Sequence, residues 1–342
     1  MKVEQYKNQI LLGDAKETLR RLPSESIDCV MTSPPYWALR DYRVDRQIGL
    51  ETTFQQYIEK LCEIFDEAKR VLKPAGTCWI NMGDTYGTGS GSGVRTGKQA
   101  TNRGTHYNCG WQEKGKAGVK GMEKCLLQIP ARFAIAMCDR GWILRNEIIW
   151  HKPNAMPQSV KDRFTVDFEK LFFFVKSRTY SFEKQYDPYT KPLNRWSGTR
   201  LDATGKSKWD EGTGQKNYRN RNMRPNISGR NKRCVWSINT RPQKDSHFAT
   251  FPPALVEIPI RAGCPEGGIV LDPFIGSGTT AVVACSLGRS FVGIDLNPAY
   301  VAIANKRLGR ALGGNPNGVL AAKIPSEVDR RSRKDKEIIK KN

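Results

Sequence analysis

The sequence predicts an α/β fold, in which a mixed, mostly parallel sheet carries helices on both faces. Short apolar runs alternate with longer segments of helical periodicity, a pattern typical of this class. Two of the runs lead into turn-forming motifs: residues 27–31 into Ser-Pro-Pro-Tyr at 33–36, and residues 268–271 into Asp-Pro-Phe-Ile-Gly-Ser-Gly-Thr at 272–279. Both motifs therefore follow strands at their carboxyl ends, where open α/β sheets bind ligands.

The N-terminal part is expected to alternate between strand and helix. Residues 10–12 form a short strand, and a helix over 15–22 connects it to the strand before Ser33. Apolar positions recur at helical spacing over residues 53–71, and the Lys-Pro-Ala-Gly sequence that follows ends this helix. Residues 77–82 form the next predicted strand.

Two polar segments without periodicity interrupt the remaining elements. These elements are a helix over 129–139, strands over 142–150 and 171–175, a helix over 253–262, a strand over 268–271, a helix over 279–287, a strand over 291–294 and a helix from Pro298. The chain is therefore expected to contain a first half over 1–182 with a flexible loop at 83–124, an insert over 183–235, a second half over 236–312, and a basic, disordered tail over 313–342.

The charge of the chain indicates a polyanionic partner. Its 342 residues include 56 Lys and Arg against 34 Asp and Glu, which gives a formal net charge of +22 at pH 7. Residues 184–244 hold 15 basic and 4 acidic residues, half of the total excess. The sequence lacks a membrane-length apolar stretch, the apolar core of a signal peptide and any Cys-x-x-Cys pair. It therefore disfavours a membrane protein, a disulfide framework and a metal site.

The two motifs together resemble the catalytic and cofactor motifs of DNA amino-methyltransferases. The catalytic motif comes first, an order similar to that of the circularly permuted beta group of this family. The resemblance extends from about Gly13 to Leu308. It implies a Rossmann-like class I methyltransferase fold, S-adenosylmethionine as the cofactor and double-stranded DNA as the substrate.

The resemblance also implies a cofactor site built from both ends of the chain. Asp272 is expected to accept a hydrogen bond from the ammonium of the methionine portion, and Asp295 from the ribose hydroxyls. Asp14 belongs to the motif that contacts the adenine. Asp14 and the segment that Asp295 begins can each also cap the helix that follows. The other expected cofactor residues are His247, Phe248, Phe274, Gly276, Ser277, Gly278, Thr279 and Leu296.

Ser33, Pro34, Pro35 and Tyr36 are the catalytic residues by the same resemblance. The exocyclic amine of a base is a poor nucleophile, because its lone pair is delocalised into the ring. Ser33 Oγ and the carbonyl of Pro34, held by the rigid Pro-Pro turn, can accept the two amine protons, while Tyr36 stacks on the extruded base. Serine in the first position is similar to the cytosine-N4 subgroup, since adenine-modifying relatives usually carry Asp or Asn there.

The predicted activity is site-specific transfer of a methyl group to N4 of a flipped cytosine, with adenine N6 as the alternative. Cytosine C5 is disfavoured, because neither Cys29 nor Cys264 lies in the motif of a cysteine nucleophile. An alternative of another class is a basic DNA-binding protein that keeps the fold without turnover. We expect a cytoplasmic, nucleoid-associated monomer or homodimer that serves restriction–modification or the protection of phage or host DNA. A cognate restriction endonuclease is a candidate partner.

The insert over 183–235 is expected to recognise the DNA sequence. Basic and aromatic residues are interspersed there, which suits phosphate attraction and base stacking, although a solubilising insert has the same composition. By the resemblance, this slot carries the target-recognition region of the family. The candidate DNA-contacting residues are Arg195, Trp196, Arg219, Arg221, Arg224 and Arg230.

Overall fold

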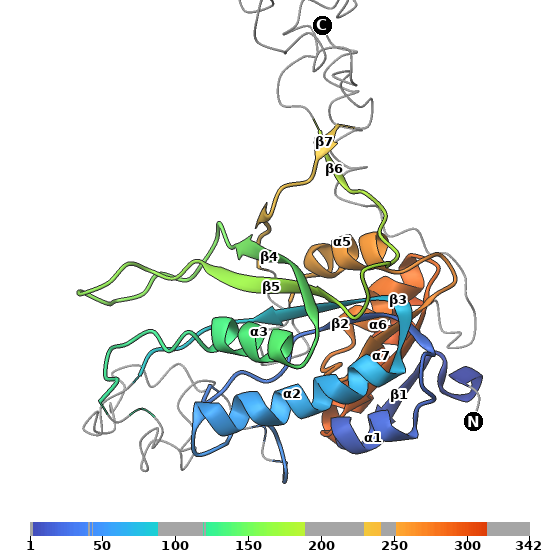
Figure 1. Cartoon of the computed structure of the whole chain (residues 1–342), viewed down its shortest axis with the longest axis horizontal. Coiled ribbons are helices and arrows are strands. Elements are labelled where there is room, and N and C mark those ends of the chain that lie inside the picture. Colours follow the sequence, from blue (N-terminus) through green and yellow to red (C-terminus); the bar gives the residue numbers. More distant parts are fainter. Residues whose placement is uncertain are drawn as a thin grey trace, which may run out of the picture. The chain divides into compact units, whose positions relative to one another are not determined.

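The computed structural model describes residues 3–39, 42, 44–87, 119, 121–188, 229–240 and 251–312. By its internal contacts the chain divides into two units, one formed by Met1–Phe182 with Cys234–Asn342 and the other by Glu183–Arg233. The first unit carries the α/β fold (Figure 1). In the described part of the chain, no helix is long and apolar enough to cross a membrane.

A sheet of eight strands lies at the centre of the described part of the first unit. Its strand order is β1 (Gln9–Leu12), β10 (Ser290–Asp295), β9 (Ile269–Asp272), β2 (Ile27–Thr32), β3 (Leu72–Met82), β5 (Phe168–Val175), β4 (Ile143–His151) and β8 (Val235–Ser237). Neighbouring strands are parallel except where β5 pairs with β3 and β4. The predicted mixed, mostly parallel sheet is confirmed.

Helices cover both faces of this sheet, as expected. One face packs against α1 (Ala15–Arg21), α2 (Phe54–Val71) and α3 (Ile129–Asp139), and the other against α5 (Pro253–Gly263), α6 (Thr279–Ser286) and α7 (Pro298–Ala311). A 3-10 helix, η1 (Val3–Tyr6), precedes β1. The predicted helices agree with the observed ones to within one or two residues at their ends, whereas β3 begins at Leu72 and not at residue 77.

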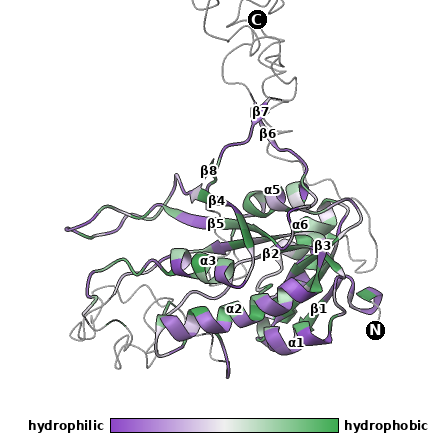
Figure 2. Cartoon of the chain, in the orientation of Figure 1, coloured by the Kyte–Doolittle hydropathy of each residue, from purple (hydrophilic) through white to green (hydrophobic). Residues whose placement is uncertain are grey.

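Strand β2 contributes to both hydrophobic cores. All six of its residues are buried, as is typical of a parallel strand between two layers of helices. Ile27 and Val30 belong to the core beneath α1, α2 and α3, whereas Cys29 and Met31 belong to the core beneath α5, α6 and α7. Hydrophobic residues accordingly concentrate on the central strands, and α2 carries hydrophobic and hydrophilic residues on different sides (Figure 2).

The chain changes direction across the sheet between β9 and β2. From β9 it passes through α6 to β10 on one side, and from β2 through α2 to β3 on the other. Such a switch point creates a crevice at the carboxyl ends of the two strands, where open α/β sheets bind their ligands. Ser33 follows β2 and Pro273 follows β9, so both sequence motifs begin at this crevice.

Side-chain caps explain where three helices begin. Asp14 accepts a hydrogen bond from the Glu17 amide at 2.9 Å, so it is the N-cap of α1, in agreement with one of its two predicted roles. Thr53 caps α2 in the same way. In the segment that begins at Asp295, the cap of α7 is Asn297.

The described part of the second unit contains a short antiparallel ladder between β6 (Tyr186–Asp187) and β7 (Arg230–Asn231). Within this unit, the Asp187 carboxylate accepts from Lys232 Nζ at 2.9 Å and from the Arg233 amide at 3.3 Å. Arg230 is the candidate DNA-contacting residue that this ladder includes. The others, Arg195, Trp196, Arg219, Arg221 and Arg224, lie outside the described residues, as do the 313–342 tail and most of the 83–124 loop.

Candidate functional site

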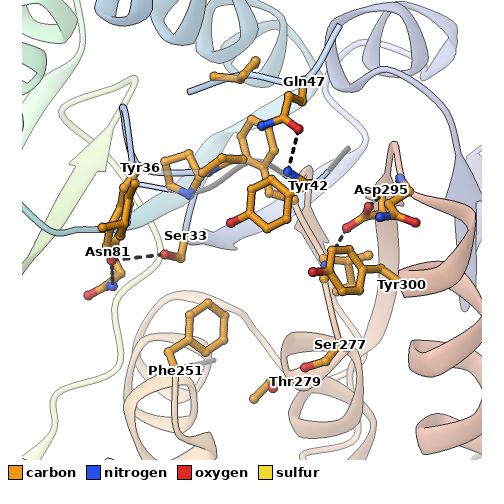
Figure 3. Close-up of a pocket in the computed structure, with 18 of the residues that line it drawn as sticks. Ser33, Tyr36, Tyr42, Gln47, Asn81, Phe251, Ser277, Thr279, Asp295 and Tyr300 are labelled. Carbon is orange, nitrogen blue, oxygen red and sulfur yellow. Dashed lines mark hydrogen bonds between the residues drawn. The ribbon is translucent and has the colours of Figure 1, made fainter. Parts of the chain in front are cut away.

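A cavity of about 870 Å³ lies at the carboxyl ends of the central strands. Ser33, Pro34, Pro35 and Tyr36 all line it, together with residues that follow β9 and β10. Figure 3 shows Ser33, Tyr36 and Asn81 on one side of the cavity and Asp295 and Tyr300 on another. The fold therefore brings the two sequence motifs to one site.

A chain of hydrogen bonds fixes the first motif. Ser33 Oγ donates to Tyr36 Oη at 3.4 Å, and Tyr36 Oη donates to a Glu169 carboxylate oxygen at 2.8 Å. Asn81 Nδ2 donates to both Tyr36 Oη and the same Glu169 oxygen at 2.8 Å, while Lys152 forms an ion pair with the other oxygen. When Ser33 donates to Tyr36, the lone pairs of Ser33 Oγ remain available to accept hydrogen bonds from a ligand.

The Tyr36 ring is held by close packing as well as by this network. A Cβ atom on Gly83 would lie 2.7 Å from Tyr36 Cε2, so only glycine fits beside the ring. Tyr57 Oη donates to the Pro35 carbonyl at 2.7 Å, which fixes the turn itself. Burial and the Glu169 carboxylate raise the pKa of Tyr36 well above its ordinary value. Tyr36 therefore remains a neutral donor.

The second side of the cavity presents a carboxylate that two backbone amides hold in place. One Asp295 oxygen accepts from the Gly276 amide at 2.9 Å and the other from the Asn297 amide at 2.8 Å. Burial raises the pKa of Asp295 above its ordinary value. Gly276 has a φ of +50°, in the left-handed region, which favours glycine at this turn.

An aromatic wall of this cavity was missed by the sequence analysis. Tyr42 and Tyr300 line the cavity and pack edge to face, with ring centroids 6.0 Å apart, and Phe251 also lines it (Figure 3). Gln47 accepts from the Tyr42 amide at 2.7 Å. Tyr300, in the first turn of α7, could have been inferred from its place after the Asp295 motif, but Tyr42 lies in no motif.

Asp272 ends β9, as predicted, and its carboxylate is buried. It is only 1% exposed and is not part of the cavity wall. One carboxylate oxygen accepts from Thr32 Oγ1 at 2.6 Å and from the Phe274 amide at 3.0 Å, and the other accepts from Thr280 Oγ1 at 2.6 Å. The hydrogen bond from Thr32 joins β9 to β2. The contact of Asp272 with the ammonium of the methionine portion stays a prediction.

The other predicted cofactor residues divide into three groups. Those that line the cavity are Asp14, Phe274, Gly276, Ser277, Thr279, Asp295 and Leu296. Gly278 does not line it, and a Cβ atom there would lie 3.0 Å from Ala304 Cβ, so this glycine allows α6 to approach α7. His247 and Phe248 lie outside the described residues.

Comparison with known proteins identifies the family. Residues 27–306 match the N6/N4 methyltransferase family, described as DNA methylase. The chain belongs to this family of DNA methylases. The Type II methyltransferase M.XycI from Xanthomonas campestris pv. cyanopsidis is 42% identical over 296 residues, and M.Cfr9I from Citrobacter freundii is 43% identical over 296 residues. Each alignment covers 86% of this chain and 86% of the relative.

Solved structures have the same fold as this methylase. The PvuII DNA methyltransferase, described as cytosine-N4-specific, gives a TM-score of 0.56 at 20% identity, covering 87% of this chain and 85% of that one. TTHA0409 from Thermus thermophilus, a putative DNA modification methylase solved with S-adenosylmethionine, gives 0.54 at 22% identity, covering 90% and 95%. The Rossmann-like methyltransferase fold predicted from the sequence is confirmed.

S-adenosylmethionine is the methyl donor of this family, as predicted. The cavity of the methylase fits this molecule chemically. Asp295 provides a fixed acceptor for hydroxyl groups, Tyr42 and Tyr300 provide apolar ring surface, and Gly276 leaves room for close approach of a ligand to the backbone.

Proposed function

We propose that this DNA methylase transfers a methyl group to N4 of a cytosine extruded from double-stranded DNA. The observation that carries the proposal is that Ser33 lines the cavity, with its hydroxyl 3.4 Å from Tyr36 Oη. Ser33 is therefore a neutral acceptor for an amine proton. By the resemblance, serine in this position favours cytosine N4, since adenine-modifying relatives usually carry Asp or Asn there.

The residues of the motif activate the amine by accepting its protons. Ser33 Oγ and the Pro34 carbonyl accept the two N–H groups, which localises the nitrogen lone pair and makes the amine more nucleophilic. S-adenosylmethionine supplies an electrophilic methyl group on a positively charged sulfur. Tyr36, whose ring is fixed by Glu169 and Gly83, provides the surface on which the extruded base stacks.

The other side of the cavity binds the donor in this proposal. Asp295 accepts from the ribose hydroxyls, and the aromatic wall of Tyr42 and Tyr300 lies against the adenine. Phe274, Ser277 and Thr279 also line the cavity, and we expect the methionine portion to lie against them. Arg307 Nη1 donates to Ser277 Oγ at 3.1 Å and to Thr279 Oγ1 at 2.8 Å, so it holds this turn in shape.

We further propose that the enzyme is the modification component of a Type II restriction–modification system. Relatives that share about two fifths of its residues over most of its length are Type II methyltransferases. A cognate endonuclease that cuts the same sequence would then be its functional partner. The residue 183–235 insert selects that sequence in this proposal.

Sequencing that distinguishes modified bases tests the proposed function. DNA would be taken from cells that otherwise lack methylation and that express either the wild-type chain or the Ser33→Ala variant. We expect N4-methylcytosine at one short recognition sequence with the wild type and none with the variant. N6-methyladenine at a defined sequence would assign the enzyme to adenine instead.

A further inference from the structure

The β4–β5 loop, residues 152–167, forms part of the rim of the cavity. Lys152, Asn154, Ala155, Met156, Gln158 and Val166 all line the cavity. From there the loop projects beyond the ends of β4 and β5 (Figure 1). This loop therefore connects the wall of the cavity to the protein surface around the opening of the cavity.

The base of this loop is firmly held. The Lys152 amide donates to the Asp167 carbonyl at 2.7 Å and closes the loop. Asn154 exchanges hydrogen bonds with Thr240, donating to its carbonyl at 3.0 Å and accepting from its amide at 2.9 Å. The exposed part of the loop is therefore presented from a fixed support.

Large apolar side chains of the loop point into solvent. Met156 is 83% exposed and Phe164 is 94% exposed. Both are among the most exposed large hydrophobic side chains of the described residues, and Met156 also lines the cavity. Both side chains are therefore available for burial against a partner that binds at this loop.

Cationic groups accompany these apolar side chains. Arg163 Cζ lies 4.0 Å from the centroid of the Tyr86 ring, and Nη1 of the same residue donates to Gln158 Oε1 at 2.9 Å. Lys161, in the same loop, is exposed. Lysine and arginine beside exposed apolar side chains are complementary to duplex DNA. The phosphates attract the cations, and apolar side chains can insert between the stacked bases.

Extrusion of a base leaves a gap that has to be filled. An amine that reaches Ser33 has left the base stack, because the amine of a paired base is not accessible at the end of such a cavity. Proteins that distort DNA commonly insert an apolar side chain between base steps, which compensates for the lost stacking. A residue suited to filling this gap lies at the opening of the cavity and is exposed before DNA binds.

We propose that the β4–β5 loop enters the DNA at the extruded base, with Met156 filling the vacated space and Phe164 packing against the adjacent bases. The inference rests on the proposed function, which requires an extruded base. It assigns a DNA contact to the first unit of the chain, separate from the residue 183–235 insert. The loop assists extrusion, and the insert chooses the sequence.

The test compares methyl transfer to two synthetic duplexes that carry the recognition sequence found by modified-base sequencing. In one duplex the target base is normally paired. In the other it lies opposite an abasic residue, so the free energy needed to extrude it is small. Single-turnover rates are measured for the wild type, for Met156→Ala, for Phe164→Ala and for the double variant. The control is Ile135→Ala, which removes an apolar side chain that is 63% exposed on α3 and is not part of the cavity wall.

On the paired duplex, the double variant should transfer methyl about tenfold or more slowly than the wild type, because no side chain compensates for the lost base stacking. On the abasic duplex its rate should return to within about twofold of the wild type. Ile135→Ala should match the wild type on both. Equal rates of the double variant and the wild type on the paired duplex, or the same loss on both duplexes, would overturn the proposal. Methylation by the wild type in the same assay establishes the activity separately from the role of the loop.

Discussion

Thr32 and Asp272 are joined by a hydrogen bond of 2.6 Å from the Thr32 hydroxyl to a carboxylate oxygen of Asp272, although 240 residues separate them in the sequence. Thr32 ends β2 and directly precedes Ser33, and Asp272 ends β9. Thr280, in the first turn of α6, donates to the second oxygen. This buried carboxylate therefore fixes the catalytic motif relative to the turn of the cofactor motif.

Replacement of Asp272 by asparagine should change how stability depends on pH. Burial raises the pKa of Asp272 to about 6 from 3.8, so the folded protein retains a proton that the unfolded chain releases. The contribution of the protonated group is complete below pH 4 and is lost as the pH rises through 6, a loss of about 3 kcal/mol in the free energy of unfolding. Asp272→Asn cannot ionise, and its urea-unfolding free energy should lack this fall.

The same variant distinguishes a structural role from the contact predicted by resemblance. If Asp272 only joins the strands, the Asp272→Asn protein should bind S-adenosylmethionine with an affinity within about threefold of the wild type, as measured by calorimetry. Loss of a charged hydrogen bond to the ammonium would instead weaken binding by about tenfold or more. The second result would support the contact that the resemblance predicts.

Enlargement of Gly83 should disable the catalytic motif without touching the donor side. The added Cβ atom of Gly83→Ala would lie 2.7 Å from the Tyr36 ring and displace it. Base stacking on an aromatic ring contributes roughly 1–3 kcal/mol, so the rate of methyl transfer should fall by about five- to 150-fold, as it should in Tyr36→Ala. S-adenosylmethionine affinity should stay unchanged. Gly309→Ala is the control, since its added Cβ meets nothing within 4 Å; equal activity of both variants would contradict the account.

Glu169 should matter for catalysis in a way that Glu147 does not. Glu169 accepts from Tyr36, Asn81 and Lys152 inside the cavity, whereas Glu147 pairs with Lys170 on the neighbouring strands outside its wall. Glu169→Gln should lower methyl transfer and cost about 1–3 kcal/mol of unfolding free energy, because hydrogen bonds to a charged acceptor are lost. Glu147→Gln should change activity little. Kinetics and urea unfolding of both variants check the difference.

Replacement of the residue 183–233 segment by a short Gly/Ser linker should separate recognition from cofactor binding. The residues that line the cavity lie outside this segment, so S-adenosylmethionine binding should persist. Methylation at the native sites should disappear, and the strong salt dependence of DNA binding should weaken because many phosphate contacts are removed. Unaltered site preference in modified-base sequencing would assign recognition to another segment, with residues 83–124 as the next candidate.

The parts of the fold that the sequence predicted are those with strong local signals. β2 and β9 are continuous apolar runs that end at distinctive turns, and α2 has clear helical periodicity over 18 residues. β8 was not predicted, because it has three residues and only Trp236 is buried. Its pairing with β4 defines it as a strand, and this pairing has no signal in the local sequence.

The candidate site was predictable only where motifs exist. Glu169 belongs to no motif, and it reaches Tyr36 because β5 pairs antiparallel with β3, which sets Leu171 opposite Asn81. Such a relationship between distant segments has no local signal. Asp272 was recognised as part of a motif, but the direction of its carboxylate depends on Thr32 and Thr280, which hold it away from the cavity.

The identity of the methylated nucleoside tests the central claim most directly. Purified enzyme is incubated with S-adenosylmethionine carrying an isotope-labelled methyl group and with DNA that contains its recognition sequence. The digested nucleosides are separated by liquid chromatography against standards of N4-methylcytosine, 5-methylcytosine and N6-methyladenine, and the labelled product is identified by mass spectrometry. Our account predicts label in N4-methylcytosine alone with the wild type, and none with Ser33→Ala. Label in N6-methyladenine or in 5-methylcytosine would contradict it.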